Sequence, residues 1–111
     1  MEHEISERDG ALIVGFSGDV DLQSSPEARK ILLQCVARKM PVLVDLSAVN
    51  YIDSSGIASL VEALQTARKG GGSLMLVSVS EAALRVLELA RLDKVFTISG
   101  SIEEGLEKAT S

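Results

Sequence analysis

The chain has 111 residues, of which 46% are hydrophobic and 24% are charged, a balance that fits one compact domain with its own core. With 16 acidic and 11 basic side chains the net charge is −5, so we expect neither a nucleic-acid binder nor a protein that binds anionic membranes. A single cysteine, Cys35, allows no internal disulfide and no zinc cage, which favours a reducing, cytoplasmic setting.

The amino-terminal segment does not resemble a targeting signal. Residues 1–8 are polar and acidic, whereas a signal peptide is basic and then apolar. No apolar run approaches the ~18 residues that a membrane span requires. We therefore expect a protein that is neither exported nor embedded in a membrane.

Two strands are expected at the start of the chain. Residues 11–17 have the composition of a strand, and the polar segment 7–10 before them is typical of a turn. A short strand over about 2–6 would then pair with 11–17 as an antiparallel hairpin.

The first helix has two possible starting points. Ser24 with Glu27 makes a capping box, whereas Ser25 as the cap places Pro26 at the first helical position. An apolar face then recurs at helical spacing until Pro41 ends the pattern. The residues of this face are Ala28, Ile31, Leu32, Cys35 and Val36.

Buried strands are predicted over residues 42–46 and 74–79, because both runs are almost continuously apolar. Between them, residues 57–64 have the apolar stripe of a helix that ends at the glycines 70–72. The apolar positions of this stripe are Ile57, Leu60, Val61 and Leu64.

The carboxyl-terminal third completes an α/β fold. Ser80 opens a third helix that runs to about Ala90, residues 95–98 form a short last strand, and Ser101 with Glu104 offers a capping box for a closing helix. The order ββαβαβαβα predicts one domain over 1–111, with a mixed, mostly parallel sheet of about five strands and about four helices.

No set of residues in the sequence fits a catalytic site. A hydrolytic triad needs a base beside its nucleophile, and the only histidine, His3, lies in or ahead of the first strand. The glycines 70–72 follow a helix and precede a strand, which is the reverse of a phosphate-binding loop. We therefore expect a protein that is not an enzyme.

Four aspartates are expected at the carboxyl ends of strands: Asp19, Asp21, Asp45 and Asp53. Scattered carboxylates of this kind would allow a Mg²⁺ site. The structural interpretation is preferred, because short aspartate side chains bond local backbone N–H groups where a turn leads into a helix. We expect neither a metal nor a cofactor.

The junction between the strand at 42–46 and the next helix carries Asp53, Ser54, Ser55 and Gly56. Unpaired N–H groups and the macrodipole make a helix start favourable for an anion, so a serine there would carry a phosphate without unfolding the domain. One cap needs only one such side chain, and Gly56 permits close backbone approach by a partner or a phosphate.

Five segments together resemble a known family. They are Gly18-Asp19-Val20-Asp21, Val42-Leu43-Val44-Asp45-Leu46, Tyr51-Ile52-Asp53-Ser54-Ser55-Gly56, Gly71-Gly72-Ser73-Leu74 and Glu104-Gly105-Leu106. The chain is similar over nearly its whole length to the anti-sigma factor antagonists, small bacterial domains also called STAS domains, whose phosphorylation motif is Asp-Ser-Ser-Gly. It differs at Ala58 and Arg91, where relatives often have glycine.

The resemblance implies that Ser54 is the phosphoacceptor and that Ser55 shapes the site. The partner-binding residues that it implies are Asp21, Asp53, Ser54, Ser55, Gly56 and Ile57. Unphosphorylated protein would bind an anti-sigma factor that is also a serine kinase and supplies ATP and Mg²⁺, releasing the sigma factor. Phosphorylation would end the binding, and a serine phosphatase would reset it. The alternative is a non-phosphorylated STAS subunit of a transporter ATPase or of another signalling complex.

Overall fold

The computed structural model describes residues 1–110 and has the expected order of elements, ββαβαβαβα. The strands are β1 (Glu2–Arg8), β2 (Ala11–Val20), β3 (Val42–Ile52), β4 (Leu74–Val77) and β5 (Ile98–Ser99). The helices are α1 (Ser25–Val36), α2 (Ser54–Lys69), α3 (Glu81–Leu89) and α4 (Ile102–Thr110). The predicted α/β class and strand content are confirmed.

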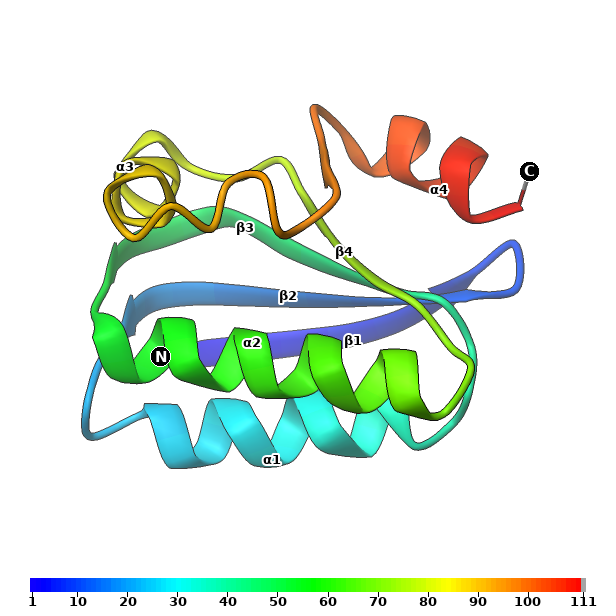
Figure 1. Cartoon of the computed structure of the whole chain (residues 1–111), viewed down its shortest axis with the longest axis horizontal. Coiled ribbons are helices and arrows are strands. Elements are labelled where there is room, and N and C mark those ends of the chain that lie inside the picture. The colour runs from blue at the N-terminus through cyan, green and yellow to red at the C-terminus, as the bar shows by residue number, and fades with distance from the viewer. Residues whose placement is uncertain (111) are drawn as a thin grey trace.

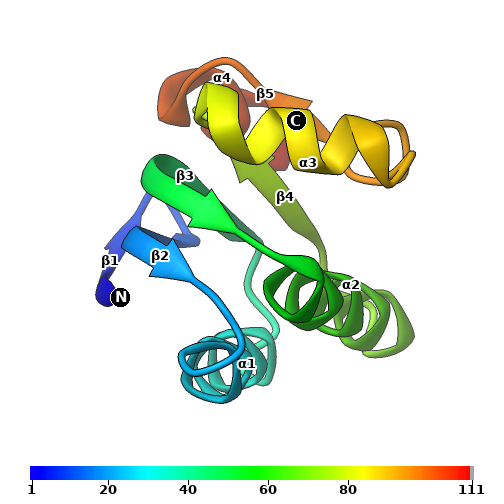
Figure 2. The ribbon, with the colours of Figure 1, turned by 90° about the vertical axis from the view of Figure 1, so that its left-hand side faces the viewer.

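The strands form one sheet in the order β1-β2-β3-β4-β5. β1 is antiparallel to β2, as the expected hairpin requires, and every other neighbouring pair is parallel. Figure 1 shows α1 and α2 side by side along one side of the sheet, with α4 on the other side. The carboxyl ends of β2 and β3 therefore meet the amino-terminal ends of α1 and α2 at the same edge of the molecule, the end that faces the viewer in Figure 2.

Two hydrophobic cores follow from the alternation of side chains along the strands. The larger core packs one face of the sheet against α1, α2 and α3, and the smaller one packs the other face against α4. Val42 and Val44 point into the larger core and Leu43 into the smaller one, which explains why this strand reads as a continuous apolar run. The whole apolar face expected for the first helix is buried.

β2 and β3 extend further than the apolar runs that predicted them. The second half of β3, residues 47–52, mixes exposed and buried positions and pairs with β2 alone, with register shifts after Gly15 and Gly18. A mixed pattern of this kind was not recognisable as part of a buried strand. As a result Asp45 lies inside β3, and its expected place at the carboxyl end of a strand is wrong.

The last strand was predicted at 95–98, but β5 contains only Ile98–Ser99. Val95 and Phe96 instead lie in a turn in which both N–H groups donate to the carbonyl oxygen of Leu92. The Phe96 side chain fills the larger core at 4% exposure. Its apolar character indicated burial correctly, and the error was to equate burial with a strand.

In the structure α1 begins after Ser24, so the start with Ser25 as the cap and Pro26 at the first helical position is wrong. Ser24 occupies the cap position, but its side chain does not cap the helix, so the capping box with Glu27 is not formed. The Ser24 hydroxyl accepts a hydrogen bond from the Asp21 N–H group and donates to the Asp19 carbonyl oxygen. Pro26 lies in the first turn of the helix.

Candidate functional site

Asp53 is the cap of α2 and organises the junction singled out in the sequence. Its Oδ1 atom accepts hydrogen bonds from the N–H groups of Ser55 and Gly56, at 3.0 and 3.2 Å. The Ser55 hydroxyl donates to the same oxygen. These contacts, the hydroxyl first, hold the pKa of the Asp53 carboxyl below its ordinary value, although partial burial opposes them.

The two serines at the start of α2 have different surroundings. The Ser55 side chain is half-buried, and its hydroxyl is held by Asp53. Ser54 is exposed, and within residues 1–110 its hydroxyl makes no hydrogen bond. Of the two, Ser54 therefore presents the hydroxyl that is free to react.

Gly56 lies where α2 touches the sheet. A Cβ atom at this position would lie 2.7 Å from Ile52 Cγ1 and 2.8 Å from the Val20 carbonyl oxygen, closer than real Cβ atoms approach. The sequence suggested room for a partner or a phosphate, whereas the groups that approach Gly56 are the carboxyl ends of β2 and β3. The neighbouring Ile57 is buried in the larger core.

The loop between β2 and α1 lies beside this junction. The Asp53 N–H group donates to the Val20 carbonyl oxygen at 3.2 Å, and the N–H group of Leu22 also lowers the pKa of Asp53. Asp21 shapes the loop, because its Oδ1 atom accepts from the N–H groups of Gln23 and Ser24. The Leu22 side chain is 75% exposed. The structure thus brings the segment with Asp21 next to the segment with Asp53.

A shallow hollow of about 490 Å³ adjoins the loop and is lined by several acidic side chains. These are Asp19, Asp21 and Glu27. No basic side chain lines this hollow, so the side chains around the loop carry a net negative charge. A partner that docks here needs positively charged or neutral groups.

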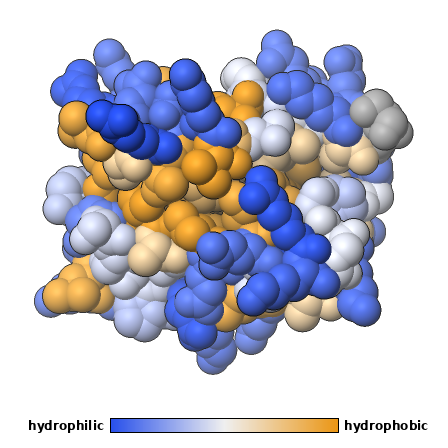
Figure 3. Space-filling model, viewed as in Figure 1, coloured by the Kyte–Doolittle hydropathy of each residue, from blue (hydrophilic) through white to orange (hydrophobic). Residues whose placement is uncertain are grey.

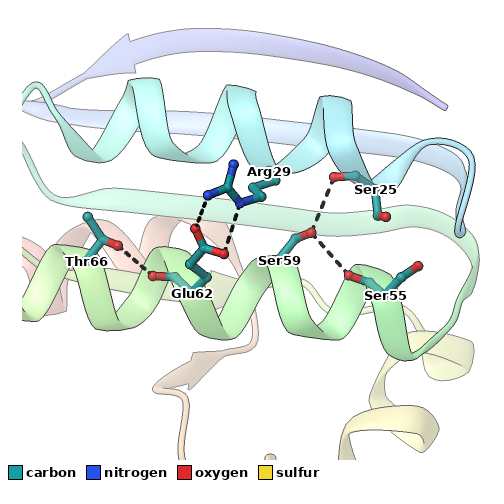
Figure 4. Close-up of polar contacts among 6 residues, drawn as sticks. All are labelled: Ser25, Arg29, Ser55, Ser59, Glu62 and Thr66. Atoms are coloured by element: carbon teal, nitrogen blue, oxygen red, sulfur yellow. Dashed lines mark hydrogen bonds and ion pairs between the residues drawn. The ribbon is translucent and has the colours of Figure 1, made fainter.

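A second hollow, of about 330 Å³, separates the amino-terminal halves of α1 and α2 (Figure 4). The buried Ser59 hydroxyl donates to the carbonyl oxygens of Ser55 and Ser25, at 3.1 and 3.3 Å. One turn further on, the Arg29 guanidinium forms two contacts with the Glu62 carboxylate, at 2.9 and 2.7 Å. This pair was not predictable from the sequence, because its members are 33 positions apart on different helices.

The structure bears on the metal site, the hydrolytic triad and the membrane span that were considered from the sequence. Within residues 1–110, no three His, Cys, Asp or Glu side chains come together in a group that would hold a metal ion. His3 is exposed on β1, opposite Phe16 of β2. No helix in the described part of the chain is long and apolar enough to cross a membrane.

The fold and the site together define the class of protein. It is an α/β domain that presents an exposed serine at the start of a helix, beside an acidic loop. The chain belongs to the STAS domain family, whose model matches residues 2–105.

Named relatives and a solved structure agree with this assignment. The chain is 27% identical over 104 residues to an anti-sigma-B factor antagonist of Bacillus subtilis, covering 94% of this chain and 95% of the relative. It is 31% identical over 97 residues to one from Listeria monocytogenes, covering 86% and 85%. The crystal structure of an anti-sigma factor antagonist from Mycobacterium paratuberculosis superimposes with a TM-score of 0.90 at 25% identity, covering 99% of this chain and 94% of that one.

Proposed function

We propose that this protein is an anti-sigma factor antagonist that changes partners through phosphorylation of Ser54. The unphosphorylated form binds an anti-sigma factor that is also a serine kinase, and the sigma factor is released. The kinase brings the ATP and Mg²⁺, phosphorylation of Ser54 ends the binding, and a serine phosphatase restores it. The names of the relatives support the class of protein, and the free, exposed Ser54 hydroxyl supports the choice of site.

The start of α2 suits a phosphate without a change of fold. The Ser54 side chain points away from the core, so the added atoms displace nothing that the domain needs. The macrodipole favours a negative group at a helix start by about 0.3–1 kcal/mol. The cap is already complete without Ser54, because Asp53 satisfies the N–H groups of Ser55 and Gly56.

The same phosphate opposes binding. It adds a charge of about −1.5 to −2 directly after the Asp53 carboxylate, which caps the same helix. An interface formed around a neutral hydroxyl would have to remove water from this group, which is costly unless new cations are supplied. Phosphorylation therefore changes the surface that the partner recognises and leaves the scaffold unchanged.

Phosphopeptide mapping after incubation with the copurified partner and ATP tests the assignment. We expect phosphate on Ser54, none on the Ser54→Ala variant, and unchanged binding of that variant to the kinase. Ser55→Ala is the matched control, since it removes the neighbouring hydroxyl and should still be phosphorylated. Phosphate on Ser55 alone would reject the site. Constant association with the partner, with no phosphate on either serine, would favour the alternative function as a non-phosphorylated STAS subunit of another complex.

A further inference from the structure

The outer side of α3 carries an exposed apolar stripe. Ala83 and Leu87 anchor the inner side of the helix at 0% exposure, whereas Leu89 is 81% exposed. Ala82 is also exposed, and the spacing of four and three residues places Val86 on the same side as Ala82 and Leu89. Val86 is half-buried because it also packs against the larger core. Figure 2 shows α3 along its length with no other element in front of it. Within the described chain, Ala82 and Leu89 therefore remain exposed, and Val86 lies between them at the border of the core.

Charged side chains border the stripe and are not used within the chain. Arg85 and Glu88 are both exposed on α3. Within residues 1–110, neither Arg85 nor Glu88 forms an ion pair or a side-chain hydrogen bond, whereas Arg8, Arg29 and Arg38 each pair with a glutamate. Both charges are free to contact a partner.

The segment formed by α3 and the turn after it has no net charge. Residues 81–97 contain three acidic and three basic side chains, so the net charge of −5 is carried by the other residues. Two copies that meet through this segment therefore bring together surfaces with balanced charges. Repulsion between like charges, which a chain of this net charge would otherwise meet, is small here.

We propose that α3 pairs with α3 of a second copy, antiparallel, about a two-fold axis that passes between Arg85 and Val86. This arrangement places the small Ala82 opposite the large Leu89 of the second copy, and the reverse, so the two stripes fit together. Arg85 of each copy then lies within reach of Glu88 of the other. The helix is complementary to itself in both size and charge.

The pairing surface continues beyond the helix. Figure 3 shows hydrophobic surface gathered between α3 and α2, with hydrophilic side chains around it. Val95, 41% exposed, lies in the turn that follows α3, and its carbonyl oxygen accepts a hydrogen bond from the Arg68 guanidinium. A nine-residue helix cannot supply the ~800 Å² per partner of a standard interface, so the dimer is weak and depends on concentration.

Sedimentation equilibrium over a wide range of protein concentration tests the pairing. We expect the average mass to rise from monomer toward dimer, and Leu89→Asp to weaken the dimer about tenfold or more. Leu22→Asp is the matched control, because Leu22 is 75% exposed but lies in the loop before α1. Circular dichroism checks that both variants are folded. A monomer at every concentration, or equal effects of the two variants, would overturn the proposal.

A charge exchange tests the orientation of the two helices. Arg85→Glu and Glu88→Arg should each weaken self-association, because each places like charges opposite one another. When the two variants are mixed, every pair across the axis becomes attractive, and native mass spectrometry should show more heterodimer than either homodimer. A mixture with no preference for the heterodimer would contradict the antiparallel arrangement.

Discussion

Asp53 makes the two neighbouring serines at the start of α2 chemically different. It holds the Ser55 hydroxyl and two backbone N–H groups, and it leaves the Ser54 hydroxyl exposed to solvent. The sequence motif predicts a phosphorylated serine but gives no physical reason to prefer the first one. The hydrogen bonds of Asp53 provide that reason.

The lowered pKa of Asp53 leads to a prediction about stability in acid. Because the folded state favours the charged carboxylate, its contribution is complete above the ordinary pKa of 3.8 and is lost as the pH falls through the lower, folded-state pKa. Asp53→Asn keeps a capping oxygen but removes the titration. In urea unfolding at a series of pH values, we expect the variant to lose less stability than the wild type below about pH 4. Equal losses would show that Asp53 contributes nothing to the acid response.

Gly56 has a packing role that alanine substitution can measure. The added Cβ meets Ile52 and the Val20 carbonyl oxygen below 3.0 Å, so α2 must move away from the sheet. We expect Gly56→Ala to lower the free energy of unfolding by about 1–3 kcal/mol, despite the better helix propensity of alanine. Gly70→Ala is the control, because its Cβ would make an ordinary contact at 3.5 Å with the Thr66 carbonyl oxygen. Denaturation that fails to separate the two variants would refute this role.

At the scale of the elements, the end of α3 shows why glycine would suit the position of Arg91. Arg91 follows the helix with φ of 60°, in the left-handed region that favours glycine, and glycine is the residue often found there in relatives. We expect Arg91→Gly to raise the free energy of unfolding by about 0.5–1 kcal/mol, because relief of the strained backbone exceeds the entropy that glycine adds to the unfolded chain. Arg85→Gly, inside α3, should lower it by about 1 kcal/mol. Thermal unfolding that moved both variants in the same direction would contradict this explanation.

The elements that the sequence predicted best are those with one clear periodicity. The face of α1 from Ala28 to Val36 is buried as expected, and Ser80 caps α3 by accepting from the Ala83 N–H group. The second half of β3 was missed because it pairs on one side only, and Phe96 was misassigned because a buried turn and a buried strand have the same composition. Local patterns do not contain such tertiary information.

The candidate site was predictable only in part for the same reason. Asp53, Ser54 and Ser55 are adjacent in the sequence, and their place at a helix start follows from the pattern of apolar residues around them. The hollow formed by Arg29, Glu62 and their neighbours depends on how α1 packs against α2. Leu22 was missed because a single leucine in a loop has no recognisable pattern, although its backbone helps to set the pKa of Asp53.

At the scale of the whole molecule, the proposed phosphorylation site lies on a helix that packs against the rest of the domain. Gly56 packs α2 directly onto β2 and β3, and the Ser59 hydroxyl links α2 to the first residue of α1. A phosphate on Ser54 is therefore added to a helix start that is packed against the sheet and α1. The proposed switch acts by changing the charge of a fixed surface, which requires that fold and binding respond differently to the same modification.

The affinity of Ser54-phosphorylated protein for the kinase that copurifies with the unmodified protein, measured by calorimetry beside the unmodified form, tests this claim most directly. We expect binding to weaken at least about a hundredfold, while the midpoint of thermal unfolding changes by no more than a few degrees. Equal affinities of the two forms, or loss of binding accompanied by unfolding of the domain, would contradict the account.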